Sequence, residues 1–432
     1  MAKIIKQCMH MHSNGEIESV DIKIEKGKII EIAAEIGSNQ DDDLIDGKNK
    51  WIAPGFIDVH VHLREPGGEQ KETIVTGTRA AAAGGFTTIC AMPNTNPVPD
   101  HVEALSSLLK VIHDQAVVNV LPYASITKGL KGKELVDFSS LAAAGAFAFT
   151  DDGVGIQSAG DMMLAMQRAN QINRPIVAHC EDNRLINNGS VHQGEVSQRL
   201  GLNGIPSVCE STQIARDVLL AEATGSHYHV CHVSTKESVR VIRDAKRAGI
   251  SVTAEVSPHH LLLNETDIQT PDSNYKMNPP LRGVADQAAL WEGLKDGTID
   301  FIATDHAPHT KEEKSNTIDL APFGIVGLET AFALLHTHFV KTEKCTLTEL
   351  IEWLTIKPAQ VFNLAKGRIE LGADADLVLL DLEKKWTIDA NQFESKGRNT
   401  PFNQWNVIGK PVMTIVNGQI VYQEGESSCI DN

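Results

Sequence analysis

The chain has 432 residues, 42% of them hydrophobic, which is enough for a large barrel with an accessory domain. Its formal net charge of −17, from 39 basic and 56 acidic residues, excludes a general nucleic-acid-binding surface but leaves room for a small anionic ligand in a local basic pocket. We find no run of 18 apolar residues, no signal-peptide pattern at the N-terminus and no Cys-x-x-Cys pair among the seven cysteines, so we predict a cytoplasmic protein with reduced thiols, without a membrane span.

Both ends of the chain contain short segments in which apolar and polar residues alternate, the pattern of half-buried strands. These segments are 20–25, 28–32, 376–381, 412–416 and 419–422. Lys26-Gly27 and Asn417-Gly418 stand between adjacent segments and predict hairpin turns. We therefore predict one small discontinuous β domain, built from residues 1–53 and 366–432.

Residues 54–365 alternate apolar, strand-like runs with helix-like stretches. The runs begin near Phe56, Phe86, Val117, Phe147, Ile176, Tyr228, Val252 and Phe301. The helix-like stretches include 73–83, 101–113, 161–170, 211–223, 236–247 and 286–295. Eight such repeats predict the α/β class and a (β/α)8 TIM barrel, whose chemistry sits at the C-terminal ends of its strands. An open doubly wound sheet is the alternative, disfavoured because no Gly-x-Gly-x-x-Gly follows the first strand.

Polar residues gather where the apolar runs end, as a barrel enzyme requires. His60 and His62 close the first run, and the alternation of a strand directs both side chains to one face. Later runs end in further candidates, namely Asn94, Asp151, Asp152, His179, His232, Asp305 and His309. Each alone is compatible with an ordinary capping or core group. Four histidines and two aspartate positions at one predicted rim instead favour a catalytic site for a divalent metal such as zinc.

These residues resemble the amidohydrolase superfamily and, within it, the type I branch of the dihydroorotases. The superfamily pattern is His-x-His on strand one, one histidine each on strands five and six, and an aspartate on strand eight. Local motifs that resemble dihydroorotase follow in the family's order at 58–67, 91–97, 149–153, 178–182, 229–235, 255–260, 276–282, 303–309 and 322–330. The resemblance implies reversible conversion of N-carbamoyl-L-aspartate to L-dihydroorotate, a step of de novo pyrimidine (UMP) biosynthesis.

The resemblance also implies two zinc ions per subunit. One would be held by His60, His62 and Asp305, and the other by His179 and His232. Many amidohydrolases bridge their metals with a carboxylated lysine at the end of strand four, where this chain has Thr150-Asp151-Asp152. Some type I dihydroorotases use an aspartate there instead. Adjacent strand residues face opposite ways, so only one of the two aspartates can reach both metals, and we favour Asp152.

The family chemistry needs a metal because an amide is a poor electrophile and water a poor nucleophile at neutral pH. A metal polarises the carbonyl and lowers the pKa of bound water to about 7. The resemblance implies a metal-bridging hydroxide as the nucleophile. It also implies that Asp305 is the general base for this hydroxide and then the general acid for the departing ring nitrogen. The alternative is that Asp305 is only a metal ligand.

Arg64, two residues after His62, suits the substrate carboxylate because a guanidinium binds a carboxylate through two parallel hydrogen bonds. Its alternative role is a salt bridge to Glu65. The resemblance implies further substrate contacts by His62, Leu63, Asn94, Asn278, His309, Phe323 and Gly324. On local grounds Asn94 is equally suited to a turn. The polar stretch 310–320 is either a solvated connection or a lid over the substrate.

His259, His260 and His306 stay without an assigned role; support of the site or packing is expected for each. Two rival functions remain. An allantoinase or hydantoinase would open another cyclic amide, although those enzymes typically keep the strand-four lysine. A non-catalytic homologue would serve as a scaffold for aspartate carbamoyltransferase, although such homologues generally lose metal ligands. The resemblance further implies a homodimer and a possible association with aspartate carbamoyltransferase.

Overall fold

Eight parallel strands form a closed barrel in this computed structural model, which describes residues 2–12 and 15–425. The strands are β6 (Phe56–Val61), β7 (Phe86–Ala91), β8 (Asn119–Pro122), β9 (Phe149–Thr150), β10 (Ile176–Ala178), β13 (Tyr228–Val230), β14 (Val252–Val256) and β15 (Phe301–Ile302). They pair as β6-β7-β8 and as β9-β10-β13-β14-β15. Parallel bridges between Ala124 and Phe149 and between Val61 and His306 join the two sheets into a ring. The predicted barrel is thus confirmed.

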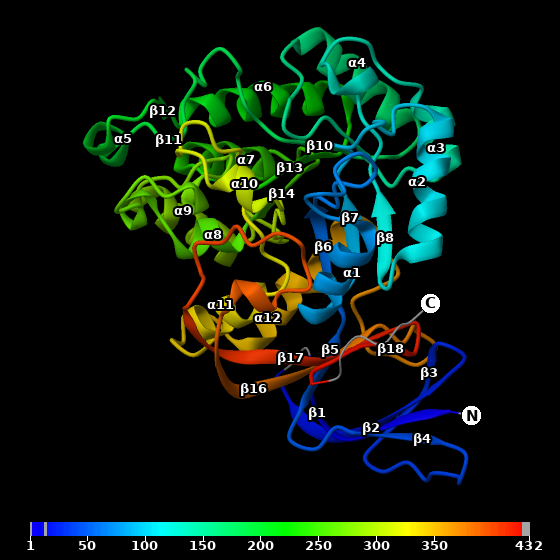
Figure 1. Cartoon of the computed structure of the whole chain (residues 1–432). Coiled ribbons are helices and arrows are strands. Elements are labelled where there is room, and N and C mark those ends of the chain that lie inside the picture. The colour runs from blue at the N-terminus through cyan, green and yellow to red at the C-terminus, as the bar shows by residue number, and fades with distance from the viewer. Residues whose placement is uncertain (1, 13–14, 426–432) are drawn as a thin grey trace.

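Helices follow the strands and cover the outside of the barrel (Figure 1). The longer ones are α1 (Ile74–Ala83), α2 (Val102–Gln115), α4 (Ala159–Gln171), α6 (Val208–Thr224), α7 (Lys236–Arg247) and α9 (Val284–Lys295). The shorter ones are α3 (Phe138–Ala144), α5 (Glu195–Leu200), α8 (Pro258–Leu262), α10 (Lys311–Lys314), α11 (Ala331–Leu335), α12 (Leu347–Leu354) and α13 (Ile356–Val361). Several begin at a capping side chain: Thr73, Ser158 and Thr235 each accept the backbone N–H of the residue three positions later.

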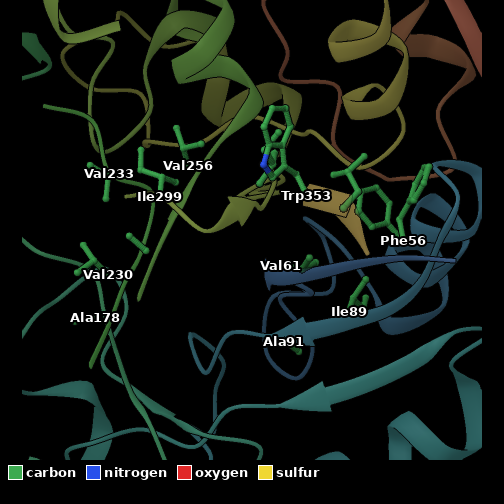
Figure 2. Close-up of a cluster of buried hydrophobic side chains, with 14 of the residues drawn as sticks. Phe56, Val61, Ile89, Ala91, Ala178, Val230, Val233, Val256, Ile299 and Trp353 are labelled. Atoms are coloured by element: carbon green, nitrogen blue, oxygen red, sulfur yellow. The ribbon is translucent and has the colours of Figure 1, made fainter. Parts of the chain in front are cut away.

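The main hydrophobic core lies between the barrel strands and these helices. Figure 2 shows part of it, including Phe56 and Val61 of β6 and Val230 of β13. Because strand side chains alternate, residues such as Val177 and Phe301 face the other way and form a separate buried cluster inside the barrel. Each such large apolar side chain contributes about 1.5–3 kcal/mol on burial, so the strand ends stand on a rigid base.

A second sheet lies below the barrel and is built from both ends of the chain (Figure 1). Its strands are β1 (Lys3–Met11), β2 (Ile17–Glu25), β3 (Lys28–Ala33), β4 (Asp43–Asp46), β5 (Trp51–Pro54), β16 (Leu377–Thr387), β17 (Asn406–Val416) and β18 (Gln419–Gln423). The central order is β18-β17-β16-β5-β1-β2-β3, and β16 runs antiparallel to β5. Both hairpins expected from the sequence are present. The Thr414 hydroxyl donates to the Ala82 carbonyl of α1 at 2.6 Å and ties the sheet to the barrel.

An excursion after β10 carries α5 and two short parallel strands, β11 (Val191–His192) and β12 (Gly204–Ile205). The periodicity of the sequence did not predict these strands, because each has only two residues. Six cysteines lie in the described residues, where all are buried and free, and Cys429 lies outside them. Within residues 2–12 and 15–425, no helix has the length and apolar character needed to span a membrane.

Candidate active site

The predicted ligands meet at the C-terminal end of the barrel. His60 lies in β6 and His62 directly follows it, while the other candidates stand one to three residues after their strands. These are Asp152 after β9, His179 after β10 and His232 after β13, with Asp305 after β15. All six side chains are buried. His232 and Asp305 have positive φ values, 29° and 50°, which non-glycine residues rarely adopt and which concentrate at functional sites.

One group of ligands gathers around His60 and His62. The Nε2 atom of His62 lies 3.1 Å from Oδ1 of Asp305, and the Nε2 atom of His60 lies 3.4 Å from the same oxygen. The Asp152 carboxylate is also close, with Oδ1 at 3.5 Å from His60 Nε2 and Oδ2 at 3.5 Å from His62 Nε2. The structure therefore brings two imidazoles and two carboxylates to one point.

A second group lies on the other side of Asp152. The Nδ1 atom of His179 is 3.0 Å from Nε2 of His232. Each of these nitrogens lies 3.8 Å from Oδ1 of Asp152. The carboxylate of Asp152 thus stands between the two groups of histidines.

Asp151 points elsewhere. Its carboxylate accepts the backbone N–H groups of Ile126 and Thr127, at 2.7 and 3.0 Å, and the Thr127 hydroxyl. Burial raises the pKa of Asp151, and these hydrogen bonds oppose the rise. Asp151 therefore fastens the loop that follows β8 and does not face the histidines.

The residues present fit a metal on chemical grounds. Buried polar atoms in proteins nearly always have a partner, yet His60 Nε2 and Asp152 Oδ1 are buried without a hydrogen bond to any described residue. His60, His62 and Asp305 form one possible three-ligand group, and His60, Asp152 and His232 form another. Imidazole and carboxylate without thiolate is the donor set of catalytic zinc sites. Although burial opposes it, the histidines hold the pKa of Asp152 well below its usual range.

Two residues behind this site were not identified from the sequence. Glu255 of β14 accepts a hydrogen bond from Nδ1 of His60 at 2.6 Å, and its other oxygen lies 3.2 Å from Nε2 of His229. The His229 ring stacks on Phe301, at 5.3 Å between ring centroids and an interplanar angle of 4°. A carboxylate behind a ligating histidine fixes the ring and its tautomer. The available signal was a charged residue within the apolar strand Val252–Val256.

Asn278 stands beside the second group. Its Nδ2 atom donates to Oε2 of Glu181 at 2.8 Å and lies 3.4 Å from Nε2 of His179. Glu181 was also not assigned from the sequence, although it follows His179 by two residues. The amide of Asn278 is therefore held at the edge of the candidate metal site by a buried carboxylate.

A basic corner lies next to the first group. The Nη2 atom of Arg64 is 3.4 Å from Nε2 of His309, and its Nε donates to the Pro308 carbonyl at 3.2 Å. Glu65, the alternative partner of Arg64, instead accepts the backbone N–H of Ile74 at 2.7 Å. Burial, Arg64 and Lys71 lower the pKa of His309 to about 3, so its ring is neutral at pH 7.

Among the other predicted substrate contacts, Asn94, Phe323 and Gly324 lie near this corner or the candidate metal site. Asn94 donates to the Asp152 carbonyl at 2.7 Å, and its Oδ1 atom is buried without a partner among the described residues. Leu63 is buried. The Phe323 carbonyl accepts from His309 at 2.8 Å. A Cβ atom on Gly324, whose φ is 131°, would lie 2.7 Å from the Ala307 side chain, so only glycine fits this approach.

The three unassigned histidines take part in neighbouring hydrogen bonds. The Ser257 hydroxyl contacts the rings of both His259 and His260. His306 Nε2 lies 3.3 Å from the buried carboxylate of Glu72, outside the two groups described above. These contacts agree with the expected role in support or packing.

Comparison with known proteins places this arrangement in a family. A dihydro-orotase-like family model matches residues 49–238, and an amidohydrolase family model matches residues 321–422. The dihydroorotase of Anoxybacillus flavithermus is 61% identical over 98% of this chain and 99% of its own. The dihydroorotase of Geobacillus thermodenitrificans is 62% identical over 99% of this chain and all of its own. The dihydroorotase of Listeria innocua is 62% identical over 98% of this chain and 99% of its own.

Solved structures give the same fold. The L-hydantoinase (dihydropyrimidinase) of Arthrobacter aurescens superposes with a TM-score of 0.89 at 29% identity, covering 98% of this chain and 96% of that one. A dihydropyrimidinase from Brevibacillus agri gives a TM-score of 0.85 at 24% identity, over 98% and 95% of the two chains, and shows the fold alone. The relatives that are about 60% identical over nearly the full length of this chain are dihydroorotases. This chain therefore belongs to the dihydroorotase family of the amidohydrolases.

Proposed function

We propose that this enzyme reversibly interconverts N-carbamoyl-L-aspartate and L-dihydroorotate in pyrimidine biosynthesis. The observation that carries the proposal is the placement of Asp152 between two groups of histidines, directly beside a corner that contains Arg64 and His309. The first feature suits hydrolysis of an amide, and the second suits a substrate with a carboxylate. The identity of about 60% to proteins named dihydroorotase supports the same reaction.

We propose two Zn²⁺ ions per chain as the cofactor. His60, His62 and Asp305 would hold one ion and His179 and His232 the other, with Asp152 shared between them. When bound, zinc supplies a Lewis acid for the amide carbonyl and lowers the pKa of bound water to roughly 7. Glu255 would hold the His60 ring in the tautomer that leaves Nε2 free for the metal.

Asp305 is proposed as the general base and acid. Although burial opposes it, the neighbouring histidines lower the pKa of Asp305, so its carboxylate is ionised at neutral pH and ready to accept a proton. During hydrolysis Asp305 takes the proton of the attacking water as the oxygen bonds to the ring carbonyl carbon. It then delivers that proton to the ring nitrogen as the carbon–nitrogen bond breaks. Ring closure runs these steps in reverse, and such proton transfer is worth about 10²–10⁴-fold in rate.

Substrate binding is proposed for residues of the basic corner and its surroundings. Arg64 would pair with the carboxylate, and the neutral ring of His309 and the second N–H of the Asn94 amide would donate further hydrogen bonds to it. The remaining contacts would come from His62, Leu63, Asn278, Phe323 and Gly324. Their support is the location of His62, Asn278, Phe323 and Gly324 around the candidate metal site, and for Leu63 the family resemblance alone.

A hydantoinase is the second candidate, because the L-hydantoinase of Arthrobacter aurescens shares the fold at 29% identity. Hydantoin and allantoin carry no carboxylate, so neither gives Arg64 a partner. The test is a comparison of ring opening for L-dihydroorotate, hydantoin and allantoin by one preparation of the enzyme. We expect L-dihydroorotate to give the highest kcat/KM. A preference for either neutral ring would overturn the proposal. Zinc-loaded protein that is inactive on all three compounds would favour the non-catalytic scaffold for aspartate carbamoyltransferase.

Further proposals concern organisation. We propose a division into a barrel of residues 54–365 and a β domain of residues 1–53 and 366–432, supported by the sheet that both chain ends share. A homodimer, an association with aspartate carbamoyltransferase and a cytoplasmic location are proposed from the family resemblance and the sequence. Size-exclusion chromatography of the enzyme, alone and with aspartate carbamoyltransferase, tests the two assemblies.

A further inference from the structure

The polar segment 310–320 contains a buried lysine. Lys314, the last residue of α10, has 8% of its surface exposed. Its ammonium donates to three backbone carbonyls, those of Lys276 at 3.3 Å, Pro322 at 3.0 Å and Gly324 at 3.1 Å. These carbonyls belong to the two segments that carry Asn278 and Phe323. One side chain therefore joins the two segments that carry the proposed substrate contacts Asn278 and Phe323.

This burial is costly for the protein. A buried ammonium normally has a carboxylate partner, and among residues 2–12 and 15–425 no carboxylate lies within ion-pair distance of Lys314. Burial, together with Lys276, lowers the pKa of Lys314 to about 7. A desolvated charge that is compensated by carbonyl groups alone gives little net stability. Its effect is to fix the positions of the three carbonyl groups.

The fixed carbonyls determine where one N–H group points. The Pro322–Phe323 peptide is not among the cis bonds of the chain, so its carbonyl and its N–H point in opposite directions. Because the Pro322 carbonyl faces Lys314, the Phe323 N–H faces away from it. The next N–H, of Gly324, donates to the Lys276 carbonyl at 2.9 Å. The Phe323 N–H has no acceptor in the described part of the chain, so it is free to donate to a bound ligand.

We propose that Lys314 is a positioning residue for the substrate, which holds the Phe323 N–H in the orientation that donates to the ring of dihydroorotate. The inference rests on the proposed function and names a residue to which that function gave no role. Lys314 itself does not touch the substrate. It acts through the Pro322–Phe323 peptide, and its loss weakens binding without altering Asp305 or the zinc ligands.

The surroundings of Lys314 are built to keep it in place. The Ser273 hydroxyl donates to the Lys314 carbonyl, and Glu313 forms an ion pair with Lys71 at 2.9 Å. Farther along the segment, the Lys276 ammonium donates to the Asp319 carbonyl at 3.0 Å. The segment 310–320 is therefore tied to the barrel at several points. We infer that segment 310–320 forms a fixed wall of the site.

The test compares four zinc-loaded enzymes: the unaltered chain, Lys314→Met, Ser273→Ala and Lys311→Met. Lys311→Met is the matched control, because Lys311 lies in the same short helix but is exposed. The measurements are kcat and KM for L-dihydroorotate, zinc per chain and the thermal unfolding midpoint. For Lys314→Met we expect KM to rise about 10-fold, with kcat within about 3-fold and zinc unchanged, the pattern of a lost binding interaction. Ser273→Ala should raise KM about 2- to 3-fold, and Lys311→Met should match the unaltered enzyme.

A purely structural role predicts a lower unfolding midpoint for Lys314→Met with KM within about 2-fold of the unaltered enzyme, and this result would overturn the inference. If Lys314→Met does not fold, Ser273→Ala decides: an unchanged KM in that variant refutes the inference. An unaltered, zinc-loaded chain that does not open L-dihydroorotate would instead refute the proposed function, and the inference with it.

Discussion

Replacement of Asp152 by alanine tests the shared carboxylate at the centre of the site. The carboxylate oxygens of Asp152 lie 3.5 Å from His60 and His62, and one of them lies 3.8 Å from both His179 and His232, so one substitution removes a carboxylate that lies close to both groups. Loss of a residue that merely supports a ligand costs about 10–100-fold in metal affinity. Loss of a ligand common to two ions should cost more. We therefore expect bound zinc to fall by about half or more and turnover by more than about 100-fold.

Asp151→Ala is the matched control, because it removes a neighbouring buried carboxylate of the same chemistry. It leaves two backbone N–H groups and the Thr127 hydroxyl without their acceptor. A buried donor without a partner costs about 1–3 kcal/mol, so stability should fall while zinc and activity are largely kept. Both variants are dialysed against the same buffer and assayed for zinc by mass spectrometry, for ring opening and for thermal unfolding. If Asp151→Ala loses more zinc than Asp152→Ala, the assignment of the shared ligand is wrong.

The remaining predictions concern the neighbours of this carboxylate and the reaction itself. Arg64→Ala should raise KM for L-dihydroorotate by about 10-fold or more while zinc is retained, because a charged hydrogen-bond partner is lost; an unchanged KM would remove its assigned role. Glu255→Gln should weaken zinc binding about 10–100-fold, since His60 loses its charged partner, and equal zinc affinity in titrations would contradict this. The pKa of His309 is lowered to about 3, so its ring stays neutral as pH falls from 8 to 5 and KM should show no fall that follows the titration of a histidine near pH 6.5. Such a fall, abolished in His309→Asn, would show that the ring becomes positively charged and attracts the substrate carboxylate. Ring closure consumes a proton as one carboxylate is lost, so the equilibrium should move toward L-dihydroorotate at low pH, and a ratio independent of pH would exclude this reaction.

Much of the barrel could be predicted from the sequence because its strands are short apolar runs with polar residues at their ends. Runs expected to begin at Phe56, Phe86, Ile176, Tyr228, Val252 and Phe301 begin there in the structure. The run expected at Phe147 begins as a strand at Phe149, and the run expected at Val117 begins at Asn119. Shifts of this size are expected, because apolar content predicts that a strand exists more reliably than it predicts where the strand begins.

Those features of the site that depend on neighbouring residues in the chain could also be predicted from the sequence. Alternation along a strand separates Asp151 from Asp152, and the structure places Thr127 beside one and the histidines beside the other. Nothing local identifies Glu255 as the partner of His60, because 195 positions separate them in the chain. Lys314 is a similar case. A polar, charged segment suggests solvent exposure. Only the packed fold shows that one of its lysines is buried against three backbone carbonyls from other parts of the chain.

The most direct test of the account is ring opening of L-dihydroorotate by the purified enzyme, with zinc per chain determined on the same sample. We predict turnover by protein that carries about two zinc ions per chain, the number that two groups of ligands around Asp152 can hold. Folded protein that has been resupplied with zinc, yet neither binds the metal nor opens the ring, would contradict both the metal site and the reaction.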